Sequence, residues 1–123
     1  MLLKVKEIDV PLPIDNLSVD KGGDIYAAAF PKIYLWAESS KNPFDVDPPS
    51  AVFRIHKSQR GVGGAKDAYD ETDAIYVVDK VLEDDGSVLP GATTAVHDTK
   101  TGRIFLSGVM SPFIAICEPT GNK

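Results

Sequence analysis

The sequence predicts an all-β fold of about two antiparallel sheets, the second of them incomplete. Short apolar runs recur along the chain between turn signals, and no helix-period pattern competes with them. Residues 17–26 also resemble residues 94–105, because each strand pattern leads through a polar, glycine-containing turn into a charged residue, an isoleucine and an aromatic residue. This repeat favours antiparallel modules such as the blades of a β-propeller, although two unrelated hairpins with common turn chemistry would give the same pattern.

The first half of the chain holds several apolar segments that we expect to be extended. Gly22 and Gly23 mark a turn between two of them, because glycine adopts backbone conformations closed to other residues. Prolines at positions 43, 48 and 49 indicate a loop before the last segment. The expected strands are Leu2–Val10, Leu17–Val19, Ile25–Ala29, a short extension at Ile33–Trp36, and Ala51–His56.

The second half begins with a segment rich in glycine and charge, Gln59–Asp73, which we expect to be an exposed loop. Apolar runs then alternate with short polar turns. The turns Asp84–Gly86 and Lys100–Gly102 each contain a glycine able to take positive φ. The expected strands are Ala74–Glu83, Thr93–His97, Arg103–Gly108 and Phe113–Cys117.

The strand count divides the chain as parts of propeller blades. Residues 1–10 would be the last strand of a preceding blade, residues 14–85 one full blade, and residues 90–118 an incomplete final blade. Propellers need about four or more blades to close. We therefore expect these blades to belong to a larger ring, or to associate with copies of themselves through exposed blade edges.

The bulk properties argue against two classes of partner. The chain has 123 residues and a net charge of −5, without the clustered Lys and Arg that nucleic-acid binding needs. No apolar stretch approaches the roughly 20 residues that span a bilayer, so we expect no transmembrane segment. Charged residues from Lys4 onward leave no apolar core for a signal peptide, and the compartment stays open.

Asp15 and Asn16 form the most informative pair of side chains. Carboxylate and amide oxygens are the ligands that a hard cation such as Ca²⁺ takes. Neighbouring residues of a regular strand face opposite ways, so both could bind one ion only where the backbone is irregular. Pro11 and Pro13 just upstream favour such an irregularity. The alternative is that Asp15 and Asn16 simply end a loop, since both residue types favour turns.

Four segments together resemble the serum paraoxonase/arylesterase family, over about Lys4 to Glu118. They are residues 15–20 (DNLSVD), 48–55 (PPSAVFRI), 83–93 (EDDGSVLPGAT) and 114–118 (IAICE). The resemblance implies the C-terminal third of a six-bladed propeller that hydrolyses aryl esters and lactones around a central calcium ion. It implies that Asp15 and Asn16 are two of the calcium ligands, the others coming from earlier blades. The family's His pair for activating water also lies upstream of the matched region.

The resemblance further implies a set of substrate-binding positions. Where the family often has His before Pro, this chain has Phe30 before Pro31, which cannot transfer a proton but can form an aromatic wall. The alternative for each position is ordinary packing or loop structure. The implied substrate-binding residues are Phe30, Tyr34, Thr93, Met110 and Ser111.

Cys117 is the only cysteine, so it can form no internal disulfide. It is expected to be a small core residue or, in a secreted protein, to pair outside the chain. The family's cysteine at this position pairs with one near the N-terminus, and that partner is absent here.

The sequence thus leaves two main hypotheses for function. One is an arylesterase or lactonase in which calcium polarises the carbonyl of a small ester or lactone substrate. The other is a non-catalytic propeller fragment or interaction module with an incomplete metal site. A weaker third is a related propeller of the gluconolactonase or strictosidine-synthase type. No catalytic residue is identified, because His56 and His97 lack any evident nucleophile.

Overall fold

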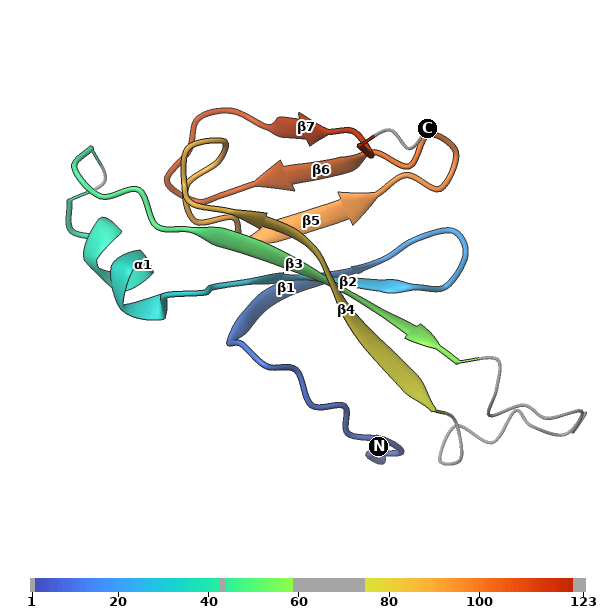
Figure 1. The fold of residues 1–123 in the computed structure, drawn as a ribbon. Helices are drawn as coiled ribbons and strands as arrows, with labels where there is room; N and C mark the ends of the chain where they lie inside the picture. Colours follow the sequence, from blue (N-terminus) through green and yellow to red (C-terminus); the bar gives the residue numbers. More distant parts are fainter. Residues whose placement is uncertain (1, 43, 59–74, 121–123) are drawn as a thin grey trace, which may run out of the picture.

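A computed structural model describes residues 2–42, 44–58 and 75–120. These residues form two antiparallel sheets and one short helix (Figure 1). Sheet A has the strand order β1-β2-β3-β4, and sheet B has the order β5-β6-β7. The strands are β1 (Ile14–Val19), β2 (Ile25–Ala29), β3 (Ser50–Lys57), β4 (Tyr76–Asp84), β5 (Thr94–His97), β6 (Ile104–Ser107) and β7 (Ala115–Cys117), and the helix is α1 (Ile33–Ser39).

Most of the expected strands are confirmed. The strand Ile25–Ala29 has the predicted bounds, and the strands expected from position 51 onward differ by at most two residues at each end. In both sheets, strands that are consecutive in sequence are neighbours in space, as in a meander. The predicted loop Gln59–Asp73 lies outside the described residues.

The hairpin turns follow the same rule in both sheets. An aspartate follows the first strand of each hairpin, and its carboxylate accepts a hydrogen bond from the backbone N–H two residues later. Asp20 accepts from Gly22, and Asp98 accepts from Lys100. Gly23 and Gly102 then take positive φ, 94° and 78°, before the return strand. The internal repeat therefore corresponds to two similar hairpins, β1–β2 and β5–β6.

Two expectations were wrong. Residues 2–10 form no strand; Ile8 and Val10 are half-buried and Leu12 packs on sheet A, but no described strand pairs with this segment. Residues 33–36 begin helix α1 instead of extending a strand. A two-turn helix is too short to show a 3.6-residue period against a strand pattern, and Pro31 just before it favours a helix start.

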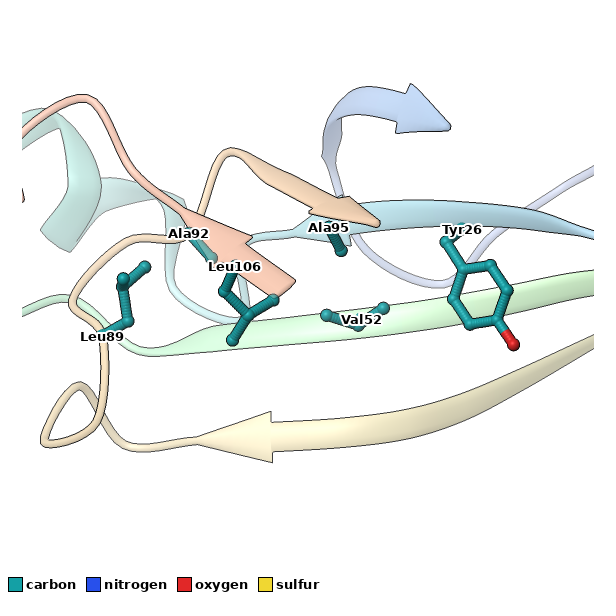
Figure 2. Packing of buried hydrophobic residues seen from close by; sticks show 6 residues of the cluster. All are labelled: Tyr26, Val52, Leu89, Ala92, Ala95 and Leu106. Atoms are coloured by element: carbon teal, nitrogen blue, oxygen red, sulfur yellow. The ribbon is translucent and has the colours of Figure 1, made fainter. Parts of the chain in front are cut away.

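The main core lies between the two sheets. Tyr26 and Val52 of sheet A pack with Ala95 and Leu106 of sheet B, and residues 89–92 of the connecting loop close one end. Figure 2 shows Leu106 extending into the space between Leu89 and Val52. Removing these apolar side chains from water is the main force that holds the sheets together.

The other face of sheet A has its own cluster. Ala29, Ala51 and Phe53 are buried there, with Leu12 and Val78 packed against them. Residues of β2 and β3 are accordingly buried on both faces, which explains why they form nearly continuous apolar runs.

Strands β1 and β5 lie side by side and join the two sheets, as Figure 1 shows. The Asn16 backbone N–H donates to the Thr93 carbonyl at 3.1 Å, and the Ser18 hydroxyl donates to the Ala95 carbonyl at 2.6 Å. We call this line of contacts the seam. Its partners are separated by about 77 residues in sequence, which is the offset of the internal repeat.

Candidate functional site

Asp15 and Asn16 lie inside β1, although the sequence placed them just before a strand. The pairing of β1 with β2 shifts register between Ile14 and Leu17, so the backbone is irregular at these two residues. The expected irregularity is present, as a bulge within the strand. A bulge breaks the strict alternation of faces, which is the condition for adjacent side chains to share one ligand.

The contacts of both side chains leave oxygen atoms available. Asn16 Nδ2 donates to Thr94 Oγ1 at 2.9 Å, so its amide nitrogen is held and its Oδ1 has no hydrogen bond among the described residues. Asp15 is exposed, and its carboxylate makes no hydrogen bond or ion pair with the described residues. Hard oxygen atoms on a fixed backbone fit the chemistry of calcium.

The number of ligands is smaller than calcium requires. Calcium takes about six to eight oxygens, and these two side chains supply a minority of them. Among the described residues, no group of three or more His, Cys, Asp and Glu side chains is placed to hold a metal ion. Water or oxygens from outside the described residues would have to fill the other positions.

Several of the predicted site residues lie at the same end of the two sheets. The Phe30 N–H donates to the Pro13 carbonyl at 3.0 Å, which places the end of β2 beside the start of β1. The Thr93 N–H donates to the Ser107 carbonyl at 2.8 Å, which brings the end of β6 to the start of β5. The topology therefore brings Asp15, Asn16, Phe30 and Thr93 to one end, although they are far apart in sequence.

The turn after β6 belongs to the same end. The Ser111 N–H donates to the Gly108 carbonyl, and its hydroxyl contacts the Pro90 carbonyl at 3.5 Å. Met110 beside it is half-buried. This turn therefore lies close to the loop that leads into Thr93.

The burial of the predicted substrate-binding residues differs widely. Phe30 and Thr93 are each 4% exposed, and the Phe30 ring packs against Trp36 with centroids 5.3 Å apart. Tyr34, on α1, is 65% exposed. The structure thus brings Asn16 and Thr93 into direct contact, whereas Phe30 packs inward and Tyr34 lies on the surface.

A cleft of about 350 Å³ lies next to helix α1. It is lined by Lys32 and Leu35 on one side and by the acidic segment 83–85 on the other. None of the predicted site residues lines this cleft.

The sequence reasoning missed a contact between Asp20 and His97 at the far end of the seam. His97 Nδ1 lies 2.8 Å from Asp20 Oδ2, and the Asp20 side chain is only 2% exposed. The His97 ring stacks on Tyr26, with centroids 4.6 Å apart. The partner of His97 is thus the distant Asp20 and not the adjacent Asp98. The repeat offset could have revealed this pairing, because it aligns Asp20 with His97.

The hydrogen bonds to Asp20 stabilise its charged form. Burial raises the pKa of the Asp20 carboxyl, but hydrogen bonds from His97 and from the N–H groups of Asp24 and Gly22 outweigh burial and hold the pKa below its usual value. Asp24 in turn pairs with Arg54 at 2.7 Å. The contact between Asp20 and His97 is a structural link between the sheets, since no nucleophilic side chain contacts His97 among the described residues.

Cys117 faces the core between the sheets. It is half-buried and packs on the cluster that contains Leu106 and Tyr26. Burial, and then the nearby Asp84 carboxylate, raise the pKa of its thiol. A thiol held in its protonated form is a poor nucleophile, which agrees with the expected role as a small core residue.

Neither the protein-family models nor the curated proteins include a match to this sequence. The resemblance to the paraoxonase family therefore stays a prediction from the residues quoted above. Within the described residues, the helix is too short to cross a bilayer.

Proposed function

We propose that the two sheets are neighbouring blades of a propeller of the serum paraoxonase/arylesterase type. Two features support this. Each sheet is an antiparallel meander, and the first strands of the two meanders, β1 and β5, lie side by side. In a propeller, the first strands of successive blades meet in this way around the central channel.

We further propose that Asp15 and Asn16 supply two ligands to a calcium ion in an ester or lactone hydrolase site. The observation that carries this proposal is the bulge in β1, where both residues have oxygens without a hydrogen-bond partner among the described residues. When bound, calcium would polarise the carbonyl of the substrate and stabilise the oxyanion that develops.

The residues of this chain would position that site. The bond from Asn16 to Thr94 fixes the amide so that its oxygen is the atom left for the ion. The backbone bond from Asn16 to Thr93 ties the bulge to sheet B. The predicted substrate-binding residues lie near this end of the sheets, and in this proposal they bound the pocket for a small ester or lactone. They are Phe30, Tyr34, Thr93, Met110 and Ser111.

A second candidate is a non-catalytic propeller fragment or interaction module. It is favoured by the small number of metal-binding side chains among the described residues. Two oxygens alone should bind calcium weakly, because affinity rises with the number of charged and rigid ligands.

Calcium titration by calorimetry distinguishes the candidates. The hydrolase proposal predicts binding that is lost in Asp15→Ala and reduced in Asn16→Ala, and calcium-dependent hydrolysis of phenyl acetate or a simple lactone. Asp9→Ala is the matched control, because Asp9 is also an exposed carboxylate but lies beside Tyr76 at the other end of sheet A. It should leave calcium affinity unchanged.

Three results would count against the hydrolase proposal. They are no heat of binding up to millimolar calcium, equal losses in the Asp15 and Asp9 variants, and hydrolysis that continues when calcium is removed with a chelator. The first of these would favour the non-catalytic candidate.

A further inference from the structure

Sheets A and B contact each other through faces that are not equivalent in the internal repeat. The two hairpin turns differ in length, so the hairpins align along their return strands, where residues 24–26 (DIY) match residues 103–105 (RIF). Tyr26 lies on the face of sheet A that contacts sheet B. Its counterpart Phe105 lies on the outward face of sheet B, because side chains alternate along a strand and the next residue, Leu106, is buried against sheet A.

The outer face of sheet A corresponds to the face of sheet B that contacts sheet A. In sheet A, Ile25 pairs with Val19. In sheet B, its counterpart Ile104 pairs with His97. The Tyr26 ring stacks on His97. By strand pairing, Val19 is therefore the counterpart of a residue that receives an aromatic ring from the neighbouring sheet.

The loops that lead into the two sheets support the same correspondence. The dipeptide Leu-Pro occurs at residues 12–13, before β1, and at residues 89–90, before β5. Leu89 is buried in the core between the sheets, and Leu12 packs on the outer face of sheet A. Because Leu12 is only partly buried, a further sheet on this face would cover it as sheet A covers Leu89.

Both outer faces carry exposed apolar side chains. On sheet A, Leu17 and Val19 are 57% and 66% exposed. On sheet B, Val96 is 46% exposed and pairs with the partly exposed Phe105. Residues 6–9 lie beside β4, at the opposite edge of sheet A from β1, so they leave Leu17 and Val19 uncovered. Exposed apolar surfaces of this kind mark interaction sites.

The charged residues beside Phe105 on the outward face of sheet B are paired with each other. Arg103 Nε donates to Glu118 Oε2 at 2.9 Å. On the face of sheet A that contacts sheet B, Asp24, the counterpart of Arg103, pairs with Arg54 at 2.7 Å. Each of these two faces thus has an aromatic side chain beside an ion pair. In sheet A, such an ion pair is compatible with a second sheet packed on the face.

We propose that the outward face of sheet B binds the outer face of sheet A of a second copy of the chain. The contact between the sheets of one copy would then be repeated between copies, with Phe105 against Val19 as Tyr26 lies against His97. Each copy has both faces, so the association is head-to-tail and ends where a ring closes. Rings of blades have about four to eight sheets, which corresponds to about two to four copies. This inference rests on the proposal that the sheets are neighbouring blades, and not on the calcium site.

The test is the mass of the chain in solution, measured by sedimentation velocity over a concentration series. The proposal predicts reversible assembly of the parent chain. Val96→Lys and Val19→Lys should each raise the dissociation constant by about tenfold or more, because each buries an unpaired charge in one of the two faces. Val88→Lys is the matched control, because Val88 is also an exposed valine but lies on the loop before β5, outside both sheet faces. This variant should assemble as the parent does.

Mixing the two face variants tests the head-to-tail geometry. Val96→Lys keeps an intact outer face of sheet A, and Val19→Lys keeps an intact outward face of sheet B. An equal mixture should therefore form complexes of two chains at concentrations where each variant alone is monomeric. The fluorescence of Trp36, on α1, reports that each variant is folded.

Three results would overturn the proposal. They are a parent chain that stays monomeric at about 100 μM, association that only one of the two face variants weakens, and an equal mixture that stays monomeric. The second result would indicate contact between identical faces instead. All measurements include a chelator, so that a failure of this proposal is seen separately from a failure of calcium binding.

Discussion

The link between Asp20 and His97 gives the sharpest stability prediction. Replacing Asp20 with Ala removes the carboxylate that joins the end of β1 to the end of β5. Its Oδ2 lies 2.8 Å from His97 Nδ1, and its Oδ1 accepts from the N–H groups of Gly22 and Asp24 at 2.9 and 3.0 Å. The seam would then be held only by the contacts nearer Asn16 and by the apolar core.

The expected cost follows from these three bonds. A hydrogen bond to a charged, buried group contributes about 1.5–3 kcal/mol, and the partly buried Asp24 N–H adds about 1 kcal/mol when left unpaired. The exposed Gly22 N–H can turn to water at little cost. Asp20→Ala should therefore lower the free energy of unfolding by about 3 kcal/mol. Asp20→Asn, which keeps an oxygen acceptor but loses the charge, should lower it by about 1–2 kcal/mol.

Urea denaturation followed by the fluorescence of Trp36, the only tryptophan, measures this change. The pair of His56 and Asp79 provides a matched control, because it is also a histidine–aspartate contact, at 3.2 Å, but lies within sheet A with Asp79 half exposed. Asp79→Ala should cost less than about 1 kcal/mol. Equal costs for the Asp20 and Asp79 variants would refute the claim that the buried link holds the sheets together.

The same link predicts how stability depends on pH. The pKa of Asp20 is held below its usual value in the folded chain, so its charge adds stability above the unfolded pKa, and this is lost as pH falls through the folded pKa. The parent chain should lose stability below about pH 4, and Asp20→Asn should show a smaller loss over the same range. An identical acid slope in both proteins would contradict the assignment.

Two further predictions concern the connections that hold the sheets. Gly86 has φ of +107°, and an added Cβ would meet a backbone carbonyl oxygen at 2.5 Å, so Gly86→Ala should cost about 2–3 kcal/mol. Gly23→Ala, with positive φ but open space around it, should cost about 1 kcal/mol, and equal costs would argue against the close approach. The buried Ser50 hydroxyl donates to the Leu89 carbonyl and accepts from the Ala92 N–H, so Ser50→Ala should cost about 2–3 kcal/mol in urea denaturation, and a loss under about 0.5 kcal/mol would refute that role.

The strands and turns could be predicted from the sequence because their signals are local. Apolar runs such as 25–29 and 104–107 follow short turns in which an aspartate side chain accepts backbone N–H bonds and a glycine takes positive φ. Helix α1 could not be predicted in this way, since its stability comes from packing of Trp36 on Phe30 more than from a periodic face. Residues 2–10 were misassigned because their recurring apolar residues suggest a strand, whereas most of them are exposed and no described strand pairs with them.

For the candidate site too, local features could be predicted from the sequence and long-range contacts could not. The chemistry of Asp15 and Asn16 is visible in their residue types, and the irregular backbone was expected from the nearby prolines. Their long-range contacts were not predictable from local pattern, because the bond from Asn16 to Thr94 spans 78 positions. The contact of Asp20 with His97 was missed for this reason, although the repeat held the offset needed to find it.

The calcium proposal is tested most directly by nuclear magnetic resonance of the ¹⁵N-labelled chain during calcium titration. Calcium binding at the bulge should give saturable shifts centred on the amides of Asp15 and Asn16, with smaller shifts at Thr93 and Thr94 across the seam. Shifts centred instead on the acidic segment 83–85, or no shifts up to about 10 mM calcium, would contradict it.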